Sequence, residues 1–257
     1  MIDNSKIKKA YTDMIVSSYK ENFQREISEE EIAEVFIYLV PRMEDELKNL
    51  KGFSEAEFDR YMNSKRNELL FSPMNIHKEL RRVLTESGEK MLAHAGKYKR
   101  LREMEVAARL CFANYKLRKE MLMVLPQDNP DIILALMGSS RKNVEASRLE
   151  IMTIPEVAKS VMGSDLPKAI VDFIKNKKFS KDYGEGCSLV VCLDFNQQSL
   201  NFDKIVETIQ KIKDNPYSGI WLTFVSSEDG KTMSVMQIFP NFVRVDYNLE
   251  KEPNLLY

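Results

Sequence analysis

The sequence predicts a mixed α+β or α/β fold, in which an amino-terminal helical layer (residues 1–96) precedes an α/β domain (residues 97–257) built on a mixed β-sheet flanked by helices. Up to about residue 125, apolar residues recur at helical spacing almost throughout. After Pro126, short apolar runs bounded by turn residues alternate with amphipathic segments, as strands and helices do in layered α/β domains. The Asp229-Gly230 pair lies between the last two runs and predicts a hairpin, which makes the sheet mixed.

The helical half contains recognisable start and stop signals. Ser28–Glu31 and Ser54–Glu57 both follow the S-x-x-E pattern of a capping box, in which the first and last side chains satisfy each other's backbone N–H groups. Pro41 weakens or ends the helix that follows the first box, and Pro73 separates two further helices. A long helix with a wide apolar stripe is predicted from about residue 97 to residue 123.

The second half predicts five strands with helices between them. The strands are 131–136, 148–154, 188–193, 220–225 and 233–239. A capping box at Thr153–Glu156 predicts a short helix that Gly163 closes, and amphipathic segments predict helices at 167–178 and 202–212.

Composition excludes several classes of protein. The 257 residues are 44% hydrophobic and 30% charged, so the chain can bury a core and is too apolar for disorder. No run approaches the about 20 apolar residues that a membrane-spanning helix needs, and the first residues lack the apolar run of a signal peptide, which predicts a cytoplasmic protein without a membrane partner. The three cysteines form no metal-binding pattern and are interpreted as buried thiols.

Common catalytic motifs are absent. The chain has no phosphate-binding G-x-x-x-x-G-K-[ST] loop, no G-x-S-x-G nucleophile elbow and no H-E-x-x-H zinc motif. Three carboxylates remain: Asp131 enters the first predicted strand after Asn129-Pro130, Glu150 lies inside the next strand, and Glu105 lies on the long helix before them. Two such acids on neighbouring strands can converge on one Mg²⁺ ion, which prefers oxygen ligands.

This order of helical Glu, Pro-Asp and strand Glu resembles the PD-(D/E)xK nuclease superfamily over about residues 97–240, with Glu105, Asp131 and Glu150 at the motif positions. The resemblance implies a restriction-endonuclease-like core and Mg²⁺- or Mn²⁺-dependent hydrolysis of DNA or RNA, with these three acids as metal ligands. It also implies a lysine that orients the nucleophile, but Met152 occupies that position. Because some members supply the lysine from a neighbouring helix, Lys159 and Lys168 are the candidates for this role.

Other interpretations of these residues remain open. Pro-Asp is frequent where a loop enters a strand, and lysines on a helix are ordinarily exposed. The alternative function is a catalytically inactive module of the same fold that binds nucleic acid or a protein partner. A third alternative is an α/β enzyme or small-molecule sensor without a recognisable motif.

The charge distribution favours a nucleic-acid partner. The net charge of the chain is −1, but residues 97–182 contain 17 basic and 11 acidic side chains and so have a net charge of +6. Residues 1–96 have a net charge of −3 and residues 183–257 of −4. A positive segment that contains all the candidate residues suits the binding of DNA or RNA phosphates.

The amino-terminal helices are assigned a regulatory, homodimerising or substrate-selecting role, in a setting such as phage defence or a mobile element.

Overall fold

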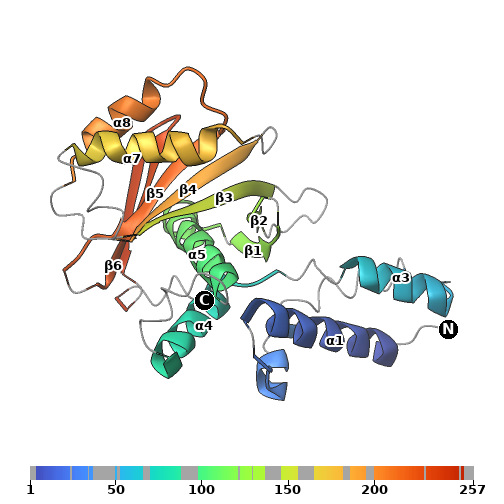
Figure 1. Cartoon of the computed structure of the whole chain (residues 1–257). Coiled ribbons are helices and arrows are strands. Elements are labelled where there is room, and N and C mark those ends of the chain that lie inside the picture. The colour runs from blue at the N-terminus through green and yellow to red at the C-terminus, as the bar shows by residue number, and fades with distance from the viewer. Residues whose placement is uncertain are drawn as a thin grey trace. The chain divides into compact units, whose positions relative to one another are not determined.

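The computed structural model divides the chain into two compact units (Figure 1). Unit 1 consists of Met1–Leu70 and Ser87–Leu101, and unit 2 of Phe71–Glu86 and Arg102–Tyr257. The structure describes residues 4–23, 25–33, 35–36, 50, 53–65, 70–87, 98–120, 122–128, 130–136, 146–155, 165–181, 186–194, 200–228, 230–248 and 250–251.

Unit 1 is helical in its described part, as predicted. Helix α1 (Asn4–Phe23) buries one face, formed by Ile7, Tyr11, Met14, Ile15 and other residues at helical spacing. Helix α3 (Glu55–Lys65) follows the second capping box.

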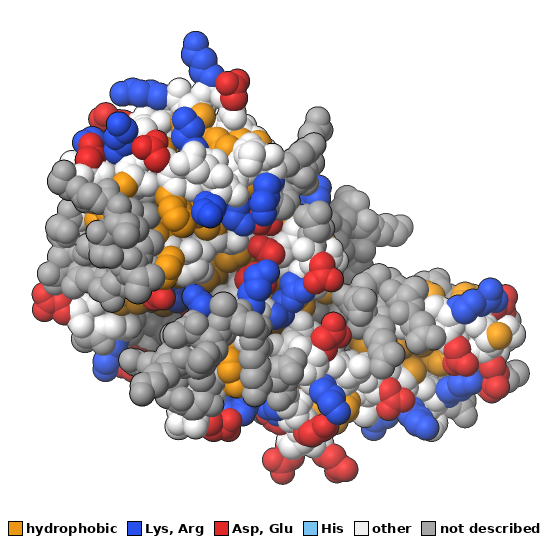
Figure 2. All heavy atoms as spheres, in the orientation of Figure 1, with side chains coloured by type: hydrophobic (Ala, Val, Ile, Leu, Met, Phe, Trp, Pro, Cys, Tyr) orange, Lys and Arg blue, Asp and Glu red, His pale blue; other side chains and the backbone are white. Residues whose placement is uncertain are grey.

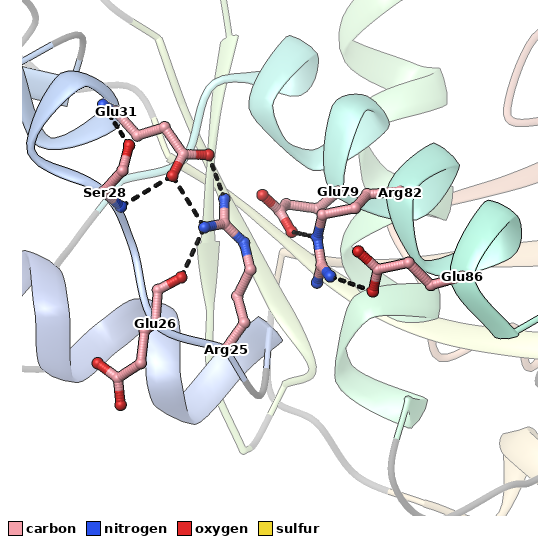
Figure 3. A network of polar contacts seen from close by, with 7 residues as sticks. All are labelled: Arg25, Glu26, Ser28, Glu31, Glu79, Arg82 and Glu86. Atoms are coloured by element: carbon pink, nitrogen blue, oxygen red, sulfur yellow. Dashed lines mark hydrogen bonds and ion pairs between the residues drawn. The ribbon is translucent and has the colours of Figure 1, made fainter.

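Both capping boxes form as the sequence predicts. Glu31 accepts a hydrogen bond from the Ser28 backbone N–H at 2.9 Å, and the Glu31 N–H donates to the Ser28 hydroxyl at 3.3 Å. Figure 3 shows that Arg25 adds a bidentate ion pair to the same carboxylate, with N···O distances of 2.5 and 2.9 Å. Because these donors favour the charged form, they lower the pKa of Glu31 to about 2.

Unit 2 is built on one mixed seven-stranded sheet with the strand order β1-β2-β3-β4-β5-β6-β7. Strands β3, β4 and β5 are parallel to each other, and every other neighbouring pair is antiparallel. The strands are β1 (Leu122–Pro126), β2 (Ile132–Leu136), β3 (Ala146–Pro155), β4 (Cys187–Asp194), β5 (Gly219–Val225), β6 (Thr232–Phe239) and β7 (Val243–Asn248). The five predicted strands and the hairpin between β5 and β6 are confirmed.

Strands β1 and β7 were not predicted. The helix expected to reach residue 123 is α5 (Lys99–Arg118), which ends before Lys119, a residue with a φ of 61°. The apolar run Leu122–Leu125 is therefore a strand, although its spacing also continues the helical stripe. Thr153 lies in strand β3 and does not cap a helix, and the short helix predicted after it lies outside the described residues.

Helices cover both faces of the sheet (Figure 1). Helix α7 (Leu166–Ile174), the π-helix η2 (Lys175–Phe179) and helix α8 (Phe202–Gln210) lie on one face. Their apolar residues pack on Met152, Ile154 and the β4 and β5 side chains of that face. Helix α5 lies on the other face, and nearly all residues of its central turns are buried.

Helix α4 (Pro73–Ser87) belongs almost entirely to unit 2, although the predicted division placed it in the helical region. Just before it, Phe71 forms a two-way backbone bridge with Val124 of β1, with N···O distances of 2.7 and 2.9 Å. On α4 itself, Arg82 binds Glu79 at 3.1 Å and Glu86 at 2.5 Å (Figure 3).

Two predictions from composition can be compared with the structure. Cys111, Cys187 and Cys192 are buried free thiols, as predicted. Within the described residues, no helix has the length and apolar character needed to cross a membrane.

Candidate active site

The candidate site lies where strand β2 ends. Beyond this point β3 continues to Pro155 and pairs with β4 on one edge, but β2 no longer pairs with its other edge. The β2–β3 register pairs Ile132 with Leu149, so the next positions facing each other are Asp131 and Glu150. Asp131 lies just outside β2, and its Oδ2 accepts a hydrogen bond from the Ile151 backbone N–H at 2.9 Å. This carboxylate occupies the place that a backbone carbonyl would take if β2 continued. The structure therefore brings together two of the three acids that the sequence singled out.

Glu150 is a buried acid with a positively charged partner. Its side chain is 7% exposed, and its Oε1 accepts a hydrogen bond from Lys178 Nζ, whose side chain is 13% exposed. The same ammonium also donates to the Ile151 carbonyl at 3.2 Å. Burying a charged carboxylate without such a partner would destabilise the fold by several kcal/mol. The Lys178 ammonium offsets this cost, so an acid can occupy position 150.

The π-helix explains how Lys178 reaches the sheet. Helix α7 begins at a cap in which Asp165 accepts from the Lys168 N–H, and Ile170 and Ile174 face the core. Hydrogen bonding from i to i+5 widens the turn after Ile174, so that Lys178 and Phe179 both turn toward the sheet.

Tyr217 contacts this turn through its hydroxyl and its ring. Its hydroxyl donates to the Lys178 carbonyl at 3.1 Å, and its ring lies 6.0 Å from the ring of Phe179. Burial, and then the negative charges of Glu150 and Asp131, raise the pKa of the Tyr217 hydroxyl, so that it stays protonated and can donate. Tyr217 is thus a positioning residue for Lys178.

Cys187 and Arg148 complete the surroundings. They face each other in the β3–β4 register, and Arg148 precedes Glu150 by two residues, so all three side chains point to the same face. Burial raises the pKa of the Cys187 thiol, the Arg148 charge opposes this shift, and the Glu150 and Asp131 charges add to it. Arg148 therefore places positive charge beside the two acids.

Glu105 does not join them. Its Oε1 accepts from Arg109 Nε at 2.7 Å, and Arg109 also reaches Cys192 Sγ at 3.5 Å. Cys192 pairs with Thr153, whose side chain points away from the face that carries Glu150. Glu105 instead compensates a largely buried arginine on the α5 face, whose side chain is 15% exposed: burial lowers the pKa of Arg109, and the Glu105 charge and the weaker interactions around it more than offset this effect.

Of the two lysines predicted from the sequence, the structure places only Lys168, and it does not reach the acids. Lys168 is exposed in the first turn of α7, ten residues before Lys178 and so about 15 Å away along the helix. Lys159 lies outside the described residues. Met152, at the position of the motif lysine, is buried in the apolar layer between the sheet and helices α7 and α8.

Lys178 is the residue that sequence reasoning missed, although a signal was present. It follows Ile170 and Ile174 at intervals of four, so it continues the buried stripe of the predicted helix 167–178. A lysine on the buried stripe of a helix needs an acidic partner, and an acid inside an apolar strand needs a basic one. The sequence could therefore have suggested that Lys178 pairs with Glu150.

The oxygen atoms at the candidate site, where β2 ends beside β3, are of the kind that Mg²⁺ and Mn²⁺ bind. The donors are the carboxylates of Asp131 and Glu150 and the carbonyl of Ile151, and the last two already hold the Lys178 ammonium. Across the described ranges, no three His, Cys, Asp or Glu side chains lie close enough together to hold a metal ion. A metal site here would therefore depend on two carboxylates, with water, phosphate or carbonyl oxygens as its other ligands.

Comparisons with protein-family models, with curated proteins and with solved structures found no match for this chain.

Proposed function

We propose that the protein is a metal-dependent nuclease that hydrolyses phosphodiester bonds of DNA or RNA at the Asp131–Glu150–Lys178 site. One observation carries the proposal: Lys178 places its ammonium group on Glu150, directly beside the residue that Asp131 binds. An acid pair with a lysine is the residue set that the PD-(D/E)xK resemblance requires. Here the lysine comes from the helix after the strand, in place of position 152.

The two acids fit an oxygen-binding divalent cation. Asp131 and Glu150 would hold Mg²⁺ or Mn²⁺ together with the Ile151 carbonyl, and the cation would supply a bound water of lowered pKa and neutralise charge on the scissile phosphate. Lys178 is close enough to Glu150 to share this oxygen cluster and to orient a water molecule or a phosphate oxygen. Tyr217 fixes the turn from which Lys178 projects.

The test separates metal binding from catalysis. Calorimetry should show that Asp131→Ala and Glu150→Ala lose Mg²⁺ binding, whereas Lys178→Met retains binding and loses cleavage of labelled DNA and RNA. Asp172→Asn is the matched control, because Asp172 is an exposed acid on α7 of the same unit. Mg²⁺ binding or cleavage that is unchanged in both alanine variants would refute the proposal.

A second candidate function is an inactive module of similar fold that binds nucleic acid without cutting it. This alternative is favoured because the described residues offer no third acid that could complete a metal-binding group with Asp131 and Glu150. The two functions differ in one measurement: the inactive module would bind oligonucleotides equally well in EDTA and in Mg²⁺ and would leave them intact in both.

A further inference from the structure

Several basic residues lie close in the fold to Lys178 and Glu150. Lys175, Lys177 and Lys181 are exposed on η2 and the residues after it, and the segment 175–181 contains no acid. Arg148 lies on the same face of β3 as Glu150. Figure 2 shows, near the centre of its visible face, Lys and Arg side chains gathered beside Asp and Glu side chains.

Among the described residues, these four basic side chains take part in no ion pair, in contrast to some other lysines of unit 2. Within the described part of the chain, no ion pair involves Lys175, Lys177, Lys181 or Arg148. By contrast, Lys204 binds Asp165 and Lys231 binds Glu250, each at 2.8 Å.

The helix macrodipole explains only part of why basic side chains gather next to Lys178. Cations at a helix carboxyl end are stabilised by the macrodipole, which accounts for the lysines in the last turn of η2. It does not account for Lys181 beyond the helix or for Arg148 on a neighbouring strand. The three exposed lysines next to Lys178 in sequence and Arg148, two residues before Glu150, form a basic surface suited to a chain of phosphates, in which one phosphate reaches the acids and its neighbours contact the cations.

We propose that Lys175, Lys177, Lys181 and Arg148, called here the η2 rim, bind the phosphate backbone of a nucleic-acid strand on either side of the scissile phosphate. This inference rests on the proposed function, for which it names the substrate-docking surface. Lysine acts at such sites as a point charge, so the rim provides affinity and positioning and does not read base sequence.

Fluorescence anisotropy on the full chain tests the rim. The variant Lys175→Gln/Lys177→Gln/Lys181→Gln is compared with Lys204→Gln/Lys231→Gln/Lys251→Gln, which removes the same charge from exposed lysines elsewhere in unit 2. The probes are labelled single-stranded DNA, duplex DNA and single-stranded RNA, titrated in EDTA so that binding is measured without hydrolysis.

The salt dependence gives the expected size of the effect. Each phosphate contact contributes about 0.7 to the slope of log K against log salt for a single strand and about 0.9 for a duplex. Loss of three contacts should lower the slope by about 2 to 3 and weaken binding roughly 100-fold at 0.1 M salt, whereas the control variant should bind like the wild type.

Three outcomes overturn the inference: equal loss in the rim and control variants, no loss in the rim variant, or binding to anionic phospholipid vesicles without binding to any oligonucleotide. The result is separable from the proposed function. If the rim variant loses binding while Asp131→Ala leaves cleavage unchanged, the docking surface stands and the hydrolytic site is refuted. If the rim variant binds normally and Asp131→Ala abolishes cleavage, the hydrolytic site stands and the rim is refuted.

Discussion

Replacement of Lys178 by methionine should destabilise unit 2 strongly, because it leaves the Glu150 carboxylate buried without its partner. Both side chains of the pair are largely buried, at 13% exposure for Lys178 and 7% for Glu150. Removal of one member of a buried ion pair costs about 3–5 kcal/mol, whereas an exposed pair contributes about 0–1 kcal/mol. We therefore expect the free energy of unfolding to fall by about 3–5 kcal/mol in Lys178→Met.

The chain contains one tryptophan, Trp221 in β5, so its fluorescence during urea unfolding reports on the sheet of unit 2. The control is Lys204→Met, which breaks the ion pair with Asp165, whose two side chains are 51% and 45% exposed. This control should lose less than about 1 kcal/mol.

A double-mutant cycle shows whether the loss comes from the pair itself. In a Glu150→Gln background the carboxylate is gone, so the further change Lys178→Met should cost much less than in the wild type. A loss of less than about 1 kcal/mol in Lys178→Met, or equal losses in both backgrounds, would refute the reasoning that the pair is buried and coupled.

Four further predictions concern single side chains. Met152→Lys, which restores the motif lysine by sequence, should destabilise unit 2 by several kcal/mol in urea unfolding and leave cleavage unimproved, because position 152 is buried among apolar residues; a stable variant with higher activity would contradict this. Glu105→Gln should cost about 3–5 kcal/mol by stranding the Arg109 charge while Mg²⁺ calorimetry stays unchanged, and loss of Mg²⁺ binding would return Glu105 to the metal site. The pKa of Glu31 is lowered to about 2, so its stabilisation should be complete above the ordinary value of 4.5 and disappear as the pH falls toward 2; a carboxyl titration near 4.5 by NMR would show that the Arg25 network does not form. Tyr247→Phe should leave stability unchanged or increase it, since the buried Tyr247 hydroxyl has no hydrogen-bond partner among the described residues, and a loss above about 1 kcal/mol would reveal a partner.

Much of the fold was predictable because its signals are local. The capping box at Ser28–Glu31 depends on residues three apart, and the five predicted strands are apolar runs between turn residues. Strand β1 was missed because Leu122–Leu125 fits a helical stripe as well as a strand, and its partner β2 lies beyond a turn. Local periodicity cannot separate these alternatives, since pairing with a second strand decides between them.

The candidate site was predictable only in part for a related reason. Asp131 and Glu150 could be placed together because neighbouring strands of a hairpin have a simple register. Glu105 was misplaced because a helix has several faces, and its distance from the sheet depends on which face packs. Lys178 was missed although it continues the stripe of Ile170 and Ile174, because a lysine near the end of a helix is ordinarily exposed and local spacing does not show that the Glu150 carboxylate lies opposite it.

The bridge between Phe71 and Val124 has a practical consequence for dividing the chain. Strand β1 is at the edge of the sheet, and backbone groups of an edge strand can pair with those of another molecule. A fragment that starts at residue 97, where the sequence changes character, would lack the segment that occupies Val124 and would leave this edge open to aggregation. A fragment that starts at residue 70 retains that cover, so the two fragments should differ in their tendency to precipitate although both encode the whole sheet.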